Sequence, residues 1–254
     1  MLSSMVSGRW EKKSLTRGED GKVFMDFDPV GFEKIVNVLR DLRVNPDRCV
    51  RIPDDYVTDL WRHRLSLPGV VPPFPGSEIL HGSEDLKDAL VAMLTGSDDD
   101  KMGEEMELLY QCTNDDVSPE LFHESCNGKG ATITIVRSTN GYIFGGYNPV
   151  SWSSSDERGI GVYSTAPDAF LFSLTNPAGT KPTKYCVEEG GVEAVCSSRY
   201  RLPCFGVGHD LCVWNDCGSY TDFPRSYIDT TGRGRATFTE AYQFTIDRVE
   251  VWKV

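Results

Sequence analysis

The sequence lacks most features that mark membrane, secreted or metal-binding proteins. No hydrophobic run approaches the ~20 residues that span a bilayer, no N-x-S/T glycosylation acceptor occurs, and no signal peptide opens the chain. The eight cysteines contain no C-x-x-C pair, although zinc sites usually use two close pairs or histidines at ligand spacing. We therefore expect a cytoplasmic protein with reduced thiols and without disulfides.

Metal and cofactor motifs are also missing. His123 and Cys126 stand near the spacing of zinc ligands, and we interpret them as a helical histidine beside a buried thiol. The acidic stretch 98–107 lacks the ordered D-x-D-x-D-G spacing of an EF-hand. Gly206 and Gly208 have no third glycine and open no helix, so a dinucleotide-binding loop is not indicated. We expect neither a metal nor a cofactor.

Acidic residues are concentrated in one part of the chain. The 254 residues carry 26 Lys and Arg against 38 Asp and Glu, a net charge of −12. Residues 77–127 alone hold 2 basic and 14 acidic residues, whereas residues 1–76 and 128–254 are nearly neutral. Such acidity disfavours nucleic acids and anionic membranes as partners. It fits either a solvated surface or an electrostatic docking site, and binding at a docking site would weaken at high salt.

Residues 140–155 carry the most informative pattern. Tyr142, Phe144 and Tyr147 stand at strand spacing around the pair Gly145 and Gly146. A glycine pair inside a strand suits a bend where backbone packs on backbone, so the pattern predicts two strands with a kink.

Three further segments are predicted from local pattern. Pro149 and the serines at 153–155 break the strand, because proline has no amide donor and short hydroxyls bond their own backbone. The apolar run Ala169 to Leu174 predicts a strand that is buried on both faces. Residues 83–94 predict a helix with one apolar face, formed by Leu86, Leu90 and Leu94.

Ordered motifs extend from residue 77 to the last residue. They are Leu108-Leu109-Tyr110, the FHESC run at 122–126, FGGY at 144–147, Trp152 with its serines, FLFSL at 170–174, residues 205–211, and Glu250-Val251-Trp252. In this order they resemble the TLDc family. The resemblance implies an α+β fold, an antiparallel β-sandwich flanked by helices. Asp168 stands where oxidation-resistance members of the family usually carry a glutamate.

The resemblance also indicates residues of structural or functional importance. The candidate interaction or structural residues are Gly145, Gly146, Trp152, Ser153, Ser154, Asp168, Gly206, Gly208, Asp210 and Glu250. Strand alternation places Glu250 and Trp252 on one face and Val249 and Val251 on the other. Glu250 is then either an exposed strand carboxylate or an acid that the fold or the function requires.

The first 67 residues have another character. A turn and a short strand are predicted within Gly21 to Pro29, followed by a helix with Phe32, Ile35, Val36 and Leu39 on one face. This part resembles the second half of a BTB/POZ domain of the potassium-channel tetramerisation type, so we expect a partial, truncated α/β unit. A Pro/Gly linker at residues 68–76 separates it from the TLDc-like part at residues 77–254.

Three functions remain open. The TLDc resemblance implies a non-catalytic interaction protein that protects against oxidative stress by binding the vacuolar proton-pumping ATPase. The BTB resemblance implies an oligomeric adaptor that self-associates and recruits a ubiquitin-ligase scaffold. A thiol-dependent, peroxide-consuming enzyme is the third, with His209 as base and Cys204 or Cys212 as nucleophile. Adjacent strand residues point to opposite faces, so Asp210 is poorly placed to orient His209, and a turn histidine is the simpler interpretation.

Overall fold

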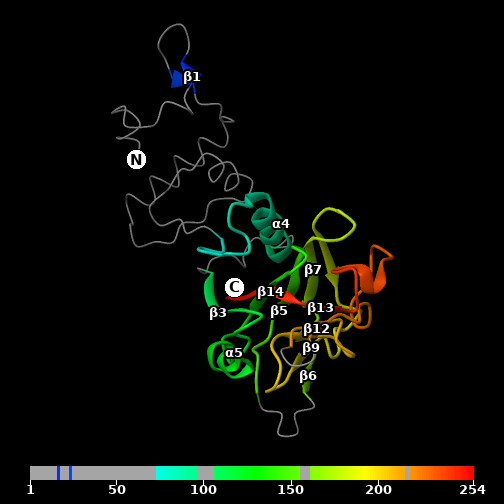
Figure 1. The fold of residues 1–254 in the computed structure, drawn as a ribbon. Helices are drawn as coiled ribbons and strands as arrows, with labels where there is room; N and C mark the ends of the chain where they lie inside the picture. Colours follow the sequence, from blue (N-terminus) through cyan, green and yellow to red (C-terminus); the bar gives the residue numbers. More distant parts are fainter. Residues whose placement is uncertain (1–15, 18–22, 25–72, 96–105, 155–160, 215–217) are drawn as a thin grey trace. The chain divides into compact units, whose positions relative to one another are not determined.

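Two six-stranded antiparallel sheets form the body of residues 73–254 in the computed structural model, which describes residues 16–17, 23–24, 73–95, 106–154, 161–214 and 218–254 (Figure 1). The long-strand sheet has the order β3 (Glu107–Thr113), β14 (Ile246–Lys253), β4 (Thr132–Ser138), β5 (Ile143–Asn148), β7 (Phe170–Thr175), β8 (Thr183–Cys186). The short-strand sheet has the order β13 (Gln243–Phe244), β12 (Ser219–Tyr220), β11 (Leu211–Cys212), β10 (Cys204–Phe205), β9 (Val195–Ser197), β6 (Val162–Ser164).

Alternation along the strands gives the long-strand sheet two buried faces. In β7, Leu171 belongs to the core cluster that also contains Phe205 of the short-strand sheet, whereas Phe170 and Phe172 belong to a second cluster on the opposite face. The prediction of a strand buried on both faces is therefore confirmed. β14 alternates in the same way, because Val249 packs in the first cluster and Trp252 in the second.

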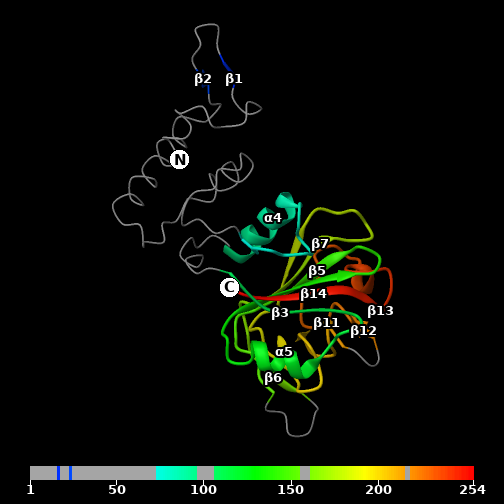
Figure 2. The same ribbon diagram turned by 60° about the vertical axis from the view of Figure 1, so that its left-hand side comes forward.

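The second cluster is covered by α4 (Glu84–Thr95) and by the segment before it (Figure 2). This confirms the helix predicted at residues 83–94. Leu90 is fully buried, and Leu86 and Leu94 pack against the cluster from the same helical face. Phe74, which the sequence places in the Pro/Gly stretch, is also buried, with its ring 5.6 Å from Trp252 in an edge-to-face contact.

A second helix, α5 (Pro119–Cys126), begins with regular capping. The hydroxyl of Ser118 accepts a hydrogen bond from the amide of Leu121, and Pro119 occupies the first turn, where no amide donor is needed. Phe122 and Cys126 are completely buried in the first cluster. A 3-10 turn, η2 (Gly234–Ala236), lies between β12 and β13.

The glycine pair lies in one continuous strand, so the prediction of two strands with a kink is wrong. β5 pairs with β4 on one side and β7 on the other, with Gly145 opposite Ile135 and Phe172. A Cβ on Gly145 would lie 1.9 Å from the carbonyl oxygen of Thr134, and one on Gly146 would lie 2.7 Å from the Phe205 ring. The glycines therefore admit neighbouring atoms on both faces, and pairing with both neighbouring strands continues through them.

Little of the first compact unit, residues 1–72, is described. β1 (Thr16–Arg17) pairs antiparallel with β2 (Val23–Phe24), which confirms a short strand within Gly21 to Pro29. The predicted helix with Phe32 and Leu39, and the rest of the BTB-type unit, lie outside the described residues. Among the described residues, no helix is long and apolar enough to cross a membrane.

The two strand glycines make a graded stability prediction. We expect Gly145→Ala to destabilise the domain more than Gly146→Ala, because its new Cβ meets backbone, while that of Gly146→Ala meets side-chain ends of Phe205 and Leu171 that can shift. Overpacking of this kind costs about 1–3 kcal/mol, and more where nothing can move. Chemical denaturation of both variants measures the difference, and equal losses would contradict the assigned packing.

Candidate functional site

The carboxylate of Glu250 is completely buried on the outer face of the long-strand sheet. Its Oε1 accepts hydrogen bonds from the amides of Glu78 (2.8 Å) and Ile79 (3.0 Å). Its Oε2 accepts from the Ser77 hydroxyl (2.6 Å) and from the Trp252 indole (3.1 Å). The interpretation of an exposed strand carboxylate is therefore wrong, because four donors within the protein take the place of water.

A second buried carboxylate, Asp210, joins loops of the short-strand sheet. Its Oδ1 accepts from the amide of Arg225 (2.6 Å) and its Oδ2 from the amide of Ser226 (2.9 Å). Burial raises the pKa of Asp210 to about 6, although these amide hydrogen bonds oppose the shift. Gly206 allows this arrangement because its φ is +80° and a Cβ there would lie 1.9 Å from Oδ2 of Asp210.

Three loops meet around this carboxylate. The amide of Gly206 donates to Ala194, the amide of Val207 donates to the Ser226 hydroxyl, and each of these hydrogen bonds is 2.8 Å long. Each loop carries one exposed aliphatic side chain; these are Val192 (66% exposed), Val207 (41%) and Ile228 (47%). We call these three residues the three-loop surface. Exposed apolar side chains on loops with fixed backbones are available for contact with a partner protein.

One stretch of the chain matches a known protein domain. It contains the glycine pair, the two buried carboxylates and the closing Glu250-Val251-Trp252 strand. The TLDc domain matches residues 80–254. The chain belongs to the TLDc domain family. Among proteins with curated descriptions, none matches the chain.

In this TLDc domain, Trp152 anchors the loop that follows β5. Its indole nitrogen donates to Thr132 Oγ1 (2.8 Å), and its ring packs edge-on against Phe205 at 5.7 Å. Ser154 Oγ accepts from the Asn127 side chain (3.1 Å), and Ser153 is partly exposed. Trp152 is thus a core residue, whereas the two serines lie at the surface. The strand ends at Asn148, which confirms the predicted break at Pro149.

Asp168 and Gly208 also lie at the surface. Asp168 is exposed immediately before the buried run of β7, and Gly208 occupies the turn between β10 and β11 with a φ of +77°. His209 follows in the same turn with a φ of +66°. The turn-histidine interpretation is confirmed. Strand alternation predicts that Asp210 points away from His209, because adjacent strand residues face opposite sides. That argument does not apply, since neither residue is in a strand and β11 begins only at Leu211.

His209 lies against cysteines of the short-strand sheet. Ligand atoms of Cys204, His209 and Cys212 lie within 4.8 Å of one another, and Cys196 is the strand partner of Cys204. Hydrogen bonding from Cys204, with help from His209, lowers the pKa of Cys196. Asp210 does not take part, since its oxygens accept from Arg225 and Ser226. The structure therefore brings together His209 and both thiols considered as nucleophiles, without the carboxylate.

His123 and Cys126 form no such group. The His123 ring bonds to Asn127 Oδ1 (2.9 Å) and to the carbonyl oxygen of Ser198 (2.8 Å), so both ring nitrogens have protein partners. Burial raises the pKa of Cys126 to about 12 and that of Cys112 to about 11. These two thiols are therefore protonated at neutral pH.

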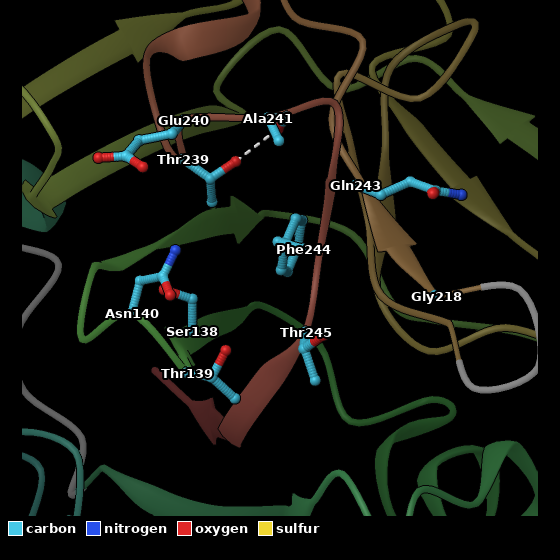
Figure 3. Close-up of a pocket in the computed structure, with 10 residues that line it drawn as sticks. All are labelled: Ser138, Thr139, Asn140, Gly218, Thr239, Glu240, Ala241, Gln243, Phe244 and Thr245. Atoms are coloured by element: carbon cyan, nitrogen blue, oxygen red, sulfur yellow. Dashed lines mark hydrogen bonds between the residues drawn. The ribbon is translucent and has the colours of Figure 1, made fainter.

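A notch of about 380 Å³ lies where the β4–β5 turn meets the segment before β14 (Figure 3). Its wall includes Asn140, Glu240 and Phe244. Thr239 Oγ1 donates to the carbonyl oxygen of Ala241 (2.6 Å), and Glu240 accepts from the Tyr142 hydroxyl (3.1 Å). The described lining contains no histidine or thiol. The notch therefore offers polar contacts to a partner, but it lacks a thiol nucleophile with a histidine base.

The Glu250 hydrogen bonds predict a stability loss on removal of the charge. We expect Glu250→Gln to lower the free energy of unfolding by about 2–3 kcal/mol, because the amide keeps one acceptor and sets an NH₂ group against existing donors. Asp168→Asn, which changes an exposed carboxylate, serves as the control and should leave stability unchanged. Thermal and chemical denaturation measure both, and equal stability of the two variants would contradict the assignment.

The buried Asp210 carboxyl predicts a pH dependence. Its pKa is about 6 in the folded state against 3.8 as the ordinary value, so folding takes up protons between these values. The stabilising contribution is present below about pH 4 and is lost as pH rises through about 6. Relative to Asp210→Asn, the unmodified domain should therefore lose roughly 2–3 kcal/mol between pH 4 and pH 8. A stability difference that stays constant with pH would show that Asp210 ionises normally.

Proposed function

We propose that this TLDc domain is a non-catalytic protein-interaction module that contributes to resistance against oxidative stress by binding the vacuolar proton-pumping ATPase. Membership of the TLDc family supports the proposal. It is also supported by the position of the residues that carry the family pattern. Glu250, Asp210 and Trp152 are buried, and their polar atoms are hydrogen-bonded within the domain. Their chemistry is thus used to hold the fold.

The observation that carries the proposal is the three-loop surface. Its three aliphatic side chains project from loops whose backbones are tied together through Ser226, Gly206 and the Asp210 carboxylate. A surface with fixed backbone loses little conformational entropy on binding, so exposed apolar contacts translate efficiently into affinity. The partner proposed for this surface is therefore a folded protein with an apolar patch of its own.

Charge supports a second part of the same proposal. The described portion of the acidic segment includes Glu84 and Asp85 in the first turn of α4, and Glu107 at the start of β3. These residues lie on elements other than those of the three-loop surface, so they would guide the encounter and would not form its apolar contacts. Asp98, Asp99 and Asp100 lie outside the described residues. Association that slows at high salt, with an unchanged dissociation rate, is the expected signature.

The test compares two variants with matched exposed side chains. In one, Val192→Asp and Val207→Asp are combined on the three-loop surface; in the other, Leu121→Asp changes an equally exposed aliphatic residue (55%) on α5. We expect the double variant to bind the catalytic sector of the ATPase at least about tenfold more weakly, as loss of a central contact would give. The Leu121→Asp variant should bind normally.

Two results would overturn the proposal. One is binding that the double variant retains and the Leu121→Asp variant loses, which would move the interface to α5. The other is an absence of binding between the unmodified chain and the ATPase. Thermal denaturation of each variant separates a lost interface from a lost fold.

A further inference from the structure

The outer face of the short-strand sheet carries a row of cysteines in strict register. Cys204 of β10 is paired directly with Cys196 of β9 on one side and with Cys212 of β11 on the other. Residues directly opposite each other in antiparallel strands have Cβ atoms about 4.5–5.5 Å apart, so Cys196 and Cys212 each stand next to Cys204, on opposite sides of it. Their neighbours in sequence, Val195 and Phe205, face the opposite way into the core between the sheets.

This row is buried although it does not belong to the main core. Cys204 and Cys212 have no exposed surface, and Cys196 is 1% exposed. The three form a separate cluster, against which Tyr163 and Tyr220 pack from the flanking strands. The three thiols therefore face away from the partner sheet and are shielded from solvent by other side chains on this face.

The turn between β10 and β11 brings a histidine to the same place. Ligand atoms of Cys204, His209 and Cys212 all lie within 4.8 Å of one another. Four ligands at the corners of a tetrahedron about 2.3 Å from a zinc ion are roughly 3.8 Å apart, so small side-chain rotations bring these groups to zinc geometry. Cys196 lies outside this group of three, and the strand register places it beside Cys204 on the side away from Cys212.

The surroundings suit a bound cation with thiolate ligands. Arg201 Nη1 donates to His209 Nε2 (2.7 Å), and the other ring nitrogen bonds to the Tyr220 hydroxyl. Both ring nitrogens of His209 therefore have protein partners, and zinc binding at one of them would replace one of these two hydrogen bonds. The partner that stays at the other nitrogen would fix the ring orientation, as is usual for metal-binding histidines. Three thiolates and one divalent ion leave one net negative charge, which the Arg201 guanidinium neutralises.

We propose that Cys204, His209 and Cys212 are three ligands of a structural zinc site on the outer face of the short-strand sheet, and that the neighbouring Cys196 moves in as the fourth ligand when the ion binds. Cysteine and histidine are the soft and borderline ligands that zinc prefers, and a closed set of four protein ligands is typical of structural sites. The ion would join β9, β10 and β11, which are only two or three residues long, and would fix the turn that carries Val207.

Cobalt provides the direct test, because tetrahedral Co²⁺ with thiolate ligands gives intense visible bands and a thiolate-to-metal charge-transfer band. The full chain, purified with reductant and stripped of metal, is titrated with Co²⁺ alone and then with Zn²⁺. We expect one equivalent of tetrahedral cobalt, displaced by zinc. Cys204→Ser and Cys212→Ser should each weaken cobalt binding by more than about 100-fold, since loss of groups that only support a ligand already costs about 10–100-fold.

Two kinds of control keep the test sharp. Cys112→Ser and Cys126→Ser remove buried thiols elsewhere in the domain and should leave the spectrum unchanged. His209→Asn keeps all three thiols and suits the positive φ of the turn, so its fold is expected to survive. It should weaken binding while the charge-transfer band remains.

Three outcomes would overturn the zinc site. They are no tetrahedral spectrum in the reduced chain, a spectrum that survives both Cys204→Ser and Cys212→Ser, and a spectrum lost on Cys112→Ser or Cys126→Ser. A disulfide within the row that forms without reductant, together with an absence of metal binding after reduction, would make the cluster a redox pair instead.

Discussion

The structure depends on a buried carboxylate that joins the beginning of the domain to its end. Glu250 lies on the last strand, and three of its four donors, from Ser77, Glu78 and Ile79, lie more than 170 residues earlier in the chain. A buried charge that loses its partners is far more costly than one that is paired, so strand and segment are stable only together. These donors stand just before residue 80, where the match to the TLDc domain begins. A domain cut at that boundary would leave Glu250 without most of its partners.

Asp210 has the corresponding role in the second sheet, but on a smaller scale. The short strands of that sheet form few ladder hydrogen bonds, so its loops need other support. The Asp210 carboxylate supplies it by accepting from two consecutive backbone amides, at Arg225 and Ser226. Loops fixed from within can present exposed apolar side chains without collapsing onto them. Both features have the same physical origin, because each buried carboxylate needs hydrogen-bond donors. At Asp210 this need fixes the loops of the proposed interaction surface, and at Glu250 it holds the first segment of the domain against the last strand.

Local pattern predicted the features that depend on nearby residues. The two-residue period of strands predicts that Val249 and Glu250 face opposite sides, and the continuous apolar run predicts the buried strand β7. The 3.6-residue period of helices predicts α4. The continuity of β5 could not be predicted, because it depends on Thr134 and Phe205, which fill the space left by the glycines. The cysteine row depends on the register of three strands. Cys204, His209 and Cys212 contain no C-x-x-C pair, yet the three-residue step from His209 to Cys212 equals the step from His123 to Cys126 and was the available signal.

Hydrogen exchange at the amides of Glu78 and Ile79 tests the central claim most directly. If the Glu250 carboxylate holds this segment as part of the domain, both amides exchange only through global unfolding, with the same protection as the amides of β14. In the Glu250→Gln variant they should lose protection ahead of β14. Rapid exchange at Glu78 and Ile79 in the unmodified domain, with β14 still protected, would contradict the account.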